Sequence, residues 1–392
     1  MLNVDYEHCT ACEACAQRCP KQCISMVGGE FDFLYPQVDL NNCIDCHLCE
    51  KVCPIQAERA HPVQQRAYAA VHKDTSILKS STSGGAFSAL ANAVLMHNGI
   101  IYGVEMDNDF VVRHIRVSSS SDLSKLRGSK YIQSRVGTAF QDAEQDLKNG
   151  KQVLFSGTPC QIDGLKHFLG KEYENLVTVD IVCHGVGSQA YFNKFLTTLT
   201  AKWPETKGLL FRSKKFAGWS CGSGSVLLND QNGKEIEKPF YSHENYYYQF
   251  FLQGDIYRQS CYTCKYANLN RPGDLTLGDF WGVERLNLSL NTYDGCSLLI
   301  CNTEKGRQLL ERVNDLQLEE VPVDKAIQQN NQLQHPSLLR AKRAQRLIDY
   351  ETKTGSEIAA SYYRLEKKSV LKGTVKKMIP YSMKVLARRW LR

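Results

Sequence analysis

The feature that most constrains this chain is a cysteine run near its start, HCTACEACAQRCP at residues 8–20, which returns as CIDCHLCEKVCP at residues 43–54. Both copies have the spacing C-x2-C-x2-C-x3-C-P. Three thiolates two residues apart can surround one iron-sulfur cubane, while the fourth, followed by proline, reaches the other cluster. Zinc favours two well-separated thiolate pairs, so this unbroken run indicates iron-sulfur clusters.

The spacing assigns four ligands to each of two 4Fe-4S clusters. We expect the first cluster to be held by Cys9, Cys12, Cys15 and Cys53, and the second by Cys43, Cys46, Cys49 and Cys19. Cys23 falls outside the pattern and is interpreted as a small buried hydrophobic residue. The segment resembles a bacterial two-cluster ferredoxin, which carries electrons but has no substrate of its own.

The composition is that of an ordinary globular protein, with 392 residues, 43% hydrophobic and 23% charged, enough for one large and one smaller domain. No stretch approaches the roughly 18 apolar residues of a membrane span. The start, MLNVDYEHC, lacks the basic and apolar regions of a presequence. We therefore expect a cytoplasmic protein whose sixteen cysteines bind metal or act in catalysis rather than form disulfides. No nucleic-acid partner is expected.

Beyond the cysteine runs, the chain alternates strand and helix patterns, which predicts an α+β or α/β fold. GIIYGVEM and FVVRHIRV are expected to pair, KQVLFSG to be a strand that runs into a helix, and SVLLNDQNGKEIEK to be a hairpin. YYYQFFLQ is expected to be a helix of the core. We predict four segments: a ferredoxin domain (1–56), a linker (57–67), a main domain (68–345) and a basic helical tail (346–392).

The main domain contains a further set of cysteines. Cys160 and Cys183 each follow a strand of the buried type, and Cys261 and Cys264 form a C-x2-C pair. Four thiols in loops of one domain can complete a metal site, although buried structural cysteines would give the same pattern. Cys296 and Cys301 flank an apolar run and are interpreted as core, and Cys221 is left unassigned.

A family resemblance covers residues 80–282. It rests on STSGGAFSAL, GSKYIQS, LFSGTPCQIDGLK, VDIVCHGVGS, FRSK and SCYTCKYANLNRPGDLTLGDFWG, in this order. These segments are similar to the coenzyme F420 hydrogenase/dehydrogenase beta-subunit family, in the form fused to a two-cluster ferredoxin. The resemblance implies a flavoprotein that binds FAD beside a third 4Fe-4S cluster, with Cys160, Cys183, Cys261 and Cys264 as that cluster's ligands.

Three short segments are the candidates for binding FAD. They are Ser83, Gly84 and Gly85; Ser129, Lys130 and Tyr131; and Gly157 with Thr158. The first lies at a predicted helix start, where free backbone amides and the helix dipole favour a phosphate. The second offers a cation for phosphate and an aromatic ring for the isoalloxazine, and the third adds donors beside Cys160. No G-x-G-x-x-G motif follows a strand, so a Rossmann-type site is not supported.

His184 is the candidate catalytic residue. A histidine beside a flavin can protonate a substrate as hydride arrives, because its ordinary pKa lies near neutrality. The alternative is that His184 only forms a hydrogen bond to the backbone or to a cluster sulfur, and Asp279 is a weaker candidate for the same role.

These features together predict an FAD- and iron-sulfur-dependent oxidoreductase. Its redox partner would be a reduced ferredoxin or a hydride carrier, and its substrate a small molecule. Since the fused form of the family occurs in surface-polysaccharide gene clusters, the resemblance suggests a sugar intermediate of polysaccharide biosynthesis. The alternatives are a non-catalytic electron-transfer subunit of a larger complex and a structural zinc protein.

The C-terminal tail carries a charge of its own. Residues 369–392 contain seven Lys or Arg residues and no acid, which matches the net charge of +7 of the whole chain. A helix from Pro380 would place Tyr381, Met383, Leu386 and Trp390 roughly on one side. This pattern suits a helix on the anionic inner face of a membrane. A terminal helix packed on the core with solvated charges is the alternative.

Overall fold

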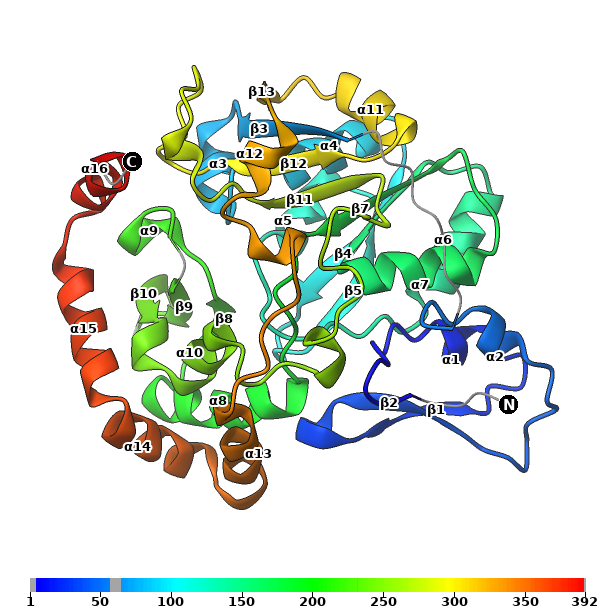
Figure 1. Ribbon diagram of the computed structural model, residues 1–392, viewed down its shortest axis with the longest axis horizontal. Helices are drawn as coiled ribbons and strands as arrows, with labels where there is room; N and C mark the ends of the chain where they lie inside the picture. Colours follow the sequence, from blue (N-terminus) through cyan, green and yellow to red (C-terminus); the bar gives the residue numbers. More distant parts are fainter. Residues whose placement is uncertain (1–4, 57–64, 221, 231, 391–392) are drawn as a thin grey trace.

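The computed structural model describes residues 5–56, 65–220, 222–230 and 232–390. Figure 1 shows a small N-terminal unit beside a larger body, with C-terminal helices along the other side of that body. Within the described ranges, no helix combines the length and apolar character needed to cross a membrane.

The N-terminal unit consists of one antiparallel hairpin and two short helices. The hairpin pairs β1 (Ile24–Gly28) with β2 (Leu34–Val38), joined through a 3-10 turn, η1 (Glu30–Asp32). Each short helix, α1 (Ala14–Arg18) or α2 (Leu48–Lys51), contains the third cysteine of one run. This is the ferredoxin-like region that the sequence repeat predicts.

An eight-stranded mixed sheet forms the centre of the larger body. Its strands are β3 (Arg66–His72), β4 (Ile100–Met106), β5 (Val112–Val117), β6 (Val153–Gly157), β7 (Leu176–Ile181), β11 (Leu275–Asp279), β12 (Ser297–Cys301) and β13 (Leu316–Val321). The order across the sheet is β13-β3-β12-β11-β7-β6-β4-β5. β4, β6, β7 and β11 are parallel neighbours, so their carboxyl ends meet at one edge, where open α/β sheets bind ligands.

Helices cover both faces of this sheet. The principal ones are α4 (Ala86–Leu95), α6 (Ala139–Lys148), α7 (Pro159–Leu169) and α11 (Glu304–Glu311). Leu154 packs with α4 and α11 on one face, and its neighbour Phe155 packs with α6 and α7 on the other. Successive strand residues point to opposite faces, so a continuous apolar run can serve both layers.

Several short elements complete the layers around the sheet. They are α3 (Thr75–Ser80), η2 (Ser120–Asp122), α5 (Leu123–Leu126), η5 (Val283–Arg285), α12 (Val323–Ile327) and η6 (Asn331–Leu333).

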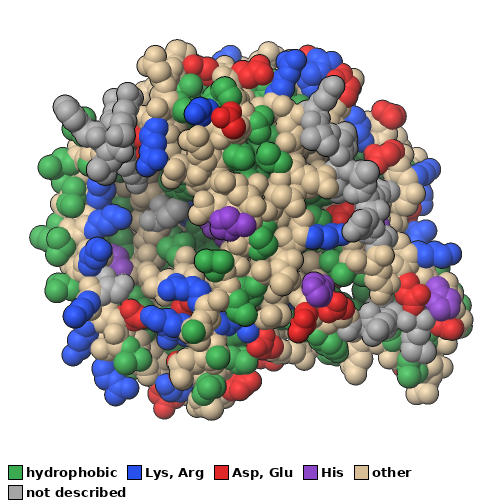
Figure 2. Space-filling view, viewed as in Figure 1, with side chains coloured by type: hydrophobic (Ala, Val, Ile, Leu, Met, Phe, Trp, Pro, Cys, Tyr) green, Lys and Arg blue, Asp and Glu red, His purple; other side chains and the backbone are tan. Residues whose placement is uncertain are grey.

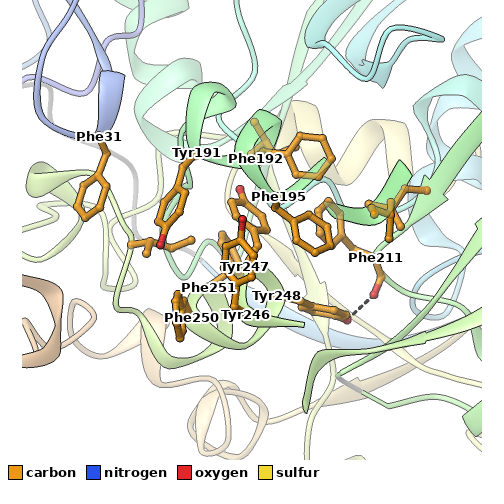
Figure 3. Close-up of a cluster of buried hydrophobic side chains, with 14 of the residues drawn as sticks. Phe31, Tyr191, Phe192, Phe195, Phe211, Tyr246, Tyr247, Tyr248, Phe250 and Phe251 are labelled. Carbon is orange, nitrogen blue, oxygen red and sulfur yellow. Dashed lines mark hydrogen bonds between the residues drawn. The ribbon is translucent and has the colours of Figure 1, made fainter. Parts of the chain in front are cut away.

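A second, three-stranded antiparallel sheet lies beside the first in Figure 1. Its strands are β8 (Thr206–Leu210), β9 (Ser223–Asn229) and β10 (Glu235–Tyr241), in the order β10-β9-β8. The accompanying helices are α8 (Gln189–Lys202), α9 (Lys214–Ala217), η3 (Ser242–Glu244), α10 (Tyr246–Gln253) and η4 (Gln259–Cys261). The sequence YYYQFFLQ forms α10, and its aromatic rings are buried in the cluster of Figure 3, as predicted.

The N-terminal unit shares this aromatic cluster. Phe31, in η1, is 1% exposed, and its ring stacks on Tyr191 of α8 with 5.6 Å between centroids (Figure 3). Beside it, Arg343 of α13 (Lys342–Thr352) forms a salt bridge with Glu30, with 2.8 Å between Nη1 and Oε1. The turn of the hairpin is therefore part of the core of the larger body.

A second contact fixes the N-terminal unit to α6. The carboxylate of Glu13 accepts hydrogen bonds from the backbone amides of Val136 and Gly137, at 3.0 and 2.9 Å. The side-chain oxygen of Gln17 accepts one from Phe140 at 3.0 Å. Val136 and Gly137 directly precede Thr138, the N-cap of α6, and Phe140 lies in the first turn, where backbone donors have no partner within the helix and an acidic side chain nearby is favourable.

The C-terminal helices follow the outside of the three-stranded sheet (Figure 1). They are α14 (Gly355–Leu365), α15 (Lys367–Met378) and α16 (Tyr381–Trp390). The ring of Tyr381 packs against Gly218 and Tyr293, so the start of α16 is attached to the body. The expected single helix from Pro380 is thus preceded by another cationic helix, α15.

The structure confirms the predicted fold class, a mixed α/β body behind a ferredoxin-like region. The expected pairs are present as β4 with β5 and β9 with β10, and KQVLFSG forms β6 followed by α7. The division into segments 1–56, 57–67, 68–345 and 346–392 stays a prediction. Most of the predicted linker, residues 57–64, lies outside the described residues, as does Cys221.

Candidate iron-sulfur and flavin sites

The four cysteines predicted for the first cluster line one recess. Cys9, Cys12, Cys15 and Cys53 surround it together with neighbouring apolar side chains. Burial raises the pKa of Cys15 to about 12. A thiolate at this position therefore needs a positive metal beside it, and iron would supply that charge. The residues fit a 4Fe-4S cluster, and their role as ligands stays a prediction.

The four cysteines predicted for the second cluster line a separate recess. Cys19, Cys43, Cys46 and Cys49 surround it, so the fourth cysteine of each run lies with the other run, as the spacing requires. Cys46 is exposed, which places this recess at the surface.

Cys23 lines the second recess as well. It is buried, as expected, and its sulfur lies 3.4 Å from that of Cys19. The spacing pattern leaves Cys23 out and therefore did not predict this contact; its place four residues after Cys19 was the available signal.

Both cysteine loops have the same unusual backbone. Ala11 and Glu13 in the first loop have φ values of 48° and 63°, and Asp45 and His47 in the second have 50° and 58°. These left-handed residues occupy equivalent places between the cysteines. Such conformations are uncommon for residues other than glycine and persist where the surroundings demand them. The sequence repeat is therefore also a repeat of backbone shape.

The third set of cysteines comes together at the carboxyl edge of the large sheet. Cys160 is the second residue of α7, after β6; Cys183 follows β7; Cys261 and Cys264 lie at and beyond η4. Burial raises the pKa of Cys183 well above its usual range, and the nearby thiols of Cys261, Cys160 and Cys264 raise it further. Four mutually close, partly buried thiols fit a cubane. Among the described residues, no three ligand side chains are arranged around a single metal ion.

α7 connects the first and third sets. Cys160 lies at its start, and Gly164, about 6 Å further along the helix axis, packs against Cys12. The same helix therefore contacts the first set about one turn after it carries Cys160 of the third set.

The predicted flavin segment at Ser83–Gly85 lies at the same edge of the sheet. Gly85 has φ 85° and begins α4, as expected. The expectation of a free amide is wrong for Gly84, whose N–H donates to Ser297 Oγ at 2.9 Å. A Cβ at Gly84 would stand 2.1 Å from the carbonyl oxygen of Ala70. Close packing against β3 and β12 is thus sufficient to explain this glycine.

The segment Ser129–Tyr131 lies beside it. The amide of Ser129 donates to Thr82 Oγ1 at 3.2 Å, which joins the two predicted flavin segments. The ammonium of Lys130 donates to the carbonyls of Val104 and Arg127, both at 2.8 Å. Burial lowers the pKa of Lys130 to about 7. The ammonium of Lys130 is therefore already bound by backbone carbonyls. Its contact with a phosphate of FAD stays a prediction.

Tyr131 belongs to the aromatic cluster. Its ring stacks on Phe251 with 4.3 Å between centroids and 13° between planes. One face of the ring is thus already covered by protein. An isoalloxazine would have to stack on the other face.

Gly157 and Thr158 end β6 and begin α7. Thr158 is the N-cap of α7, and its amide donates to Gln161 Oε1 at 3.1 Å. Its hydroxyl lies 3.1 Å from the sulfur of Cys160. A Cβ at Gly157 would stand 3.3 Å from Nε2 of His114. The predicted flavin donors and the predicted third-cluster ligand therefore share one turn.

His184 lies next to a cluster of charged and aromatic side chains. It is exposed, although the surrounding protein restricts its hydration and lowers its pKa; Asp279 opposes that shift and Arg212 adds to it. Asp279 binds Arg212 Nη1 at 2.5 Å and accepts a hydrogen bond from Trp219 Nε1 at 2.8 Å. Figure 2 shows one face of the molecule, where the surface is hollowed beside a column of basic side chains.

Lys214 extends this cluster toward the predicted flavin segment. Its ammonium donates to the carbonyls of Leu78 and Ser83, at 2.6 and 2.5 Å. Burial lowers its pKa to about 8. The segment FRSK, which contains Arg212 and Lys214, contributes to the family resemblance, but sequence reasoning assigned neither residue a role.

Two family models match the chain. Residues 150–326 match the family described as the C terminus of the coenzyme F420 hydrogenase/dehydrogenase beta subunit, and residues 4–57 match the 4Fe-4S dicluster domain. The chain is similar to this beta-subunit family over residues 150–326, and a dicluster domain precedes that region. It is thus an iron-sulfur protein of the oxidoreductase type, related to electron-transfer subunits.

One solved structure similar to the chain is that of the F420-reducing NiFe hydrogenase complex from Methanosarcina barkeri, studied by xenon derivatization. The sequences are 15% identical, the match covers 79% of this chain and 92% of that chain, and the TM-score is 0.44. No curated protein matches the chain.

Proposed function

We propose that the protein is an FAD- and iron-sulfur-dependent oxidoreductase with three 4Fe-4S clusters. The observation that carries this proposal is the convergence of Cys160, Cys183, Cys261 and Cys264 at the carboxyl edge of the sheet. A two-cluster ferredoxin needs only the eight thiols of its two runs. A third set, whose Cys160 lies on the helix that contacts the first set, therefore supports an additional cluster.

The proposed electron route starts at the second recess, where Cys46 is exposed to a donor. It passes to the first recess through the shared N-terminal unit. It then crosses along α7 to the third set and ends at FAD, bound among the segments at Ser83, Ser129 and Gly157. When bound there, FAD would exchange single electrons for a two-electron hydride step.

The protein's own residues would position the reactants in this scheme. His184 would hold or release a proton at the substrate, while Asp279 favours its protonated form by raising its pKa against the effect of the surrounding protein. The substrate would be a small molecule, and we propose a sugar intermediate of surface-polysaccharide synthesis. The donor would be a reduced ferredoxin or a hydride carrier.

The alternative is a non-catalytic subunit that passes electrons within a larger complex. Relatives in the same family are hydrogenase or dehydrogenase subunits by name, which favours it. Native purification separates the two: a stable hetero-complex supports the subunit, and a monomer or homodimer that reduces a substrate supports the enzyme.

Metal and flavin analysis of anaerobically purified protein tests the main proposal. We expect about twelve irons per chain, against about eight for a ferredoxin unit alone, and about one FAD. A chain with about eight irons and no flavin would contradict it.

We also propose that this otherwise cytoplasmic protein binds the inner face of the membrane through its tail. Leu371, Val375 and Met378 lie on one face of α15 and are 66%, 56% and 79% exposed. The neighbouring Lys372 and Lys376 are exposed too. An apolar row beside cations matches an anionic lipid surface. Tyr381, expected on the apolar side of the helix from Pro380 and not on α15, packs against the body instead.

A further inference from the structure

Arg258 is buried at the junction of the N-terminal unit and the main body. It is 1% exposed. Its Nε donates to the carbonyl of Cys9 at 2.8 Å, and its Nη2 to the carbonyl of Leu34 at 2.5 Å. Its Nη1 lies 3.3 Å from Gln133 Oε1. One guanidinium thus contacts the first cysteine loop, the hairpin and the main body.

These contacts neutralise none of its charge. The other buried arginines, Arg212, Arg271, Arg343 and Arg346, each lie within 4.0 Å of a carboxylate. For Arg258, no carboxylate lies within that distance in the part of the chain that the structure describes. Its guanidinium donates to carbonyl and amide oxygens and lies over the rings of Tyr35 and Phe33, 4.2 and 5.2 Å from their centroids, and these uncharged partners do not neutralise it. A buried ion without a counter-charge is costly, so an anion is expected nearby.

The thiols around Arg258 are where such an anion would form. Cys261 donates its amide to the carbonyl of Arg258 at 3.0 Å, so Arg258 also shapes the turn that carries the third set. Burial raises the pKa of the Cys9 and Cys160 thiols, and Arg258 opposes that effect at both. Arg258 therefore contacts the first set through its guanidinium, at Cys9, and the third set through its backbone carbonyl, at Cys261.

We propose that Arg258 is the shared counter-charge of the first cluster and the third cluster, and that it raises the reduction potential of both. Because a 4Fe-4S cluster with four thiolates is an anion that becomes more negative on reduction, a fixed cation between two of them favours the electron at either one. Arg258 would thereby stabilise the transferred electron on the first and third clusters, where it passes from the N-terminal unit to the main body. The inference rests on the proposed clusters.

Redox titration of the intact protein, followed by electron paramagnetic resonance, tests this role. Arg258→Met should shift the midpoint potentials of the first and third clusters to more negative values. Arg258→Lys, which keeps the charge, should shift them much less. The second cluster would lie in a separate recess, and the guanidinium of Arg258 donates to Cys9, Leu34 and Gln133, none of which lines that recess. Its potential should therefore stay the same in every variant.

A variant that leaves Arg258 in place covers the case in which Arg258→Met does not assemble. Gln133→Glu sets a carboxylate at the site of the oxygen now 3.3 Å from the guanidinium, and should also make both potentials more negative. Gln133→Leu removes the same contacts without adding charge and is the matched control.

Equal shifts in Arg258→Met and Arg258→Lys would show a purely structural role and overturn the proposal, as would unchanged potentials in Arg258→Met or Gln133→Glu. Iron content separates this result from the proposed function. If the chain holds only about eight irons, the third cluster is lost, yet the potential of the first still tests Arg258.

Discussion

Gly164 of α7 lies so close to Cys12 of the N-terminal unit that a Cβ on the glycine would stand 2.8 Å from the cysteine Cβ and 2.9 Å from its sulfur. Real Cβ atoms do not approach so closely, so the position excludes any side chain. The glycine lets the helix that carries Cys160 touch the loop that carries Cys12, which keeps the two predicted clusters near each other.

Gly164→Ala should disturb the first cluster. Alanine is favoured over glycine inside a helix by about 1 kcal/mol, so the helix itself would gain stability. Any loss of iron must therefore come from the collision of the added methyl group with Cys12. We expect a fall of up to about four irons per chain and a changed signal of the first cluster.

Gly28→Ala is the matched control, because its added methyl approaches Asp32, with Oδ1 at 3.1 Å, and no cysteine of either recess. Full iron content with unchanged cluster signals in Gly164→Ala would show that the close contact is unimportant for the cluster.

Replacing Cys261 and Cys264 with serine should remove about four irons, leave the two ferredoxin-type signals and stop electrons from reaching FAD. Cys301→Ala is the control, since Cys301 is buried in the core beside α11, as predicted for it and for Cys296. If iron content and flavin reduction both survived the double change, the pair would be structural.

His114 should make the fold sensitive to mild acid. Burial lowers the pKa of His114 from its ordinary 6.5 to about 4, and Nε2 donates to the carbonyl of Ser156 at 3.1 Å. Between these pH values the unfolded chain binds a proton that the folded chain does not. The free energy of unfolding should therefore fall by about 3 kcal/mol as pH drops from 6.5 to 4.

The comparison variant is His114→Gln, which keeps a donor but does not titrate there. The wild-type unfolding midpoint should decline with falling pH more steeply than that of the variant. Parallel declines would show that His114 is charged in the folded protein at pH 5.

The tail should bind anionic vesicles. Changing Leu371, Val375 and Met378 to glutamine should abolish sedimentation with phosphatidylglycerol vesicles, and added salt should weaken it, because both burial and charge contribute. Met96, which is 75% exposed elsewhere, provides the matched control as Met96→Gln. Equal binding by the triple variant and the wild type would exclude this face as the membrane contact.

The ferredoxin-like region could be predicted in detail because its information is local. Spacing alone predicted which cysteines share a recess, since Cys19 and Cys53 must cross between the runs. The strands and the hairpin could be predicted for the same reason. Alternating apolar and polar residues and an Asn-Gly turn are properties of residues that are near neighbours in the chain.

The contacts between distant segments could not be predicted in this way. Arg258 lies in DIYRQSC, where nothing distinguishes it from an exposed arginine; its role depends on Cys9 and Leu34, more than 200 residues away in the chain. At Gly84 the sequence suggests a site that packing explains instead. A glycine before a helix is typical of a phosphate-binding loop, but Gly84 packs against Ala70.

The insertion of Phe31 into the aromatic cluster has a consequence for how the protein obtains electrons. A carrier domain on a flexible tether delivers charge by swinging between partners, but this N-terminal unit is anchored through its own hairpin turn. If the protein works as proposed, the external donor has to approach the face where Cys46 is exposed. The rate of turnover in that scheme should then depend on donor concentration rather than on a swing of the N-terminal unit.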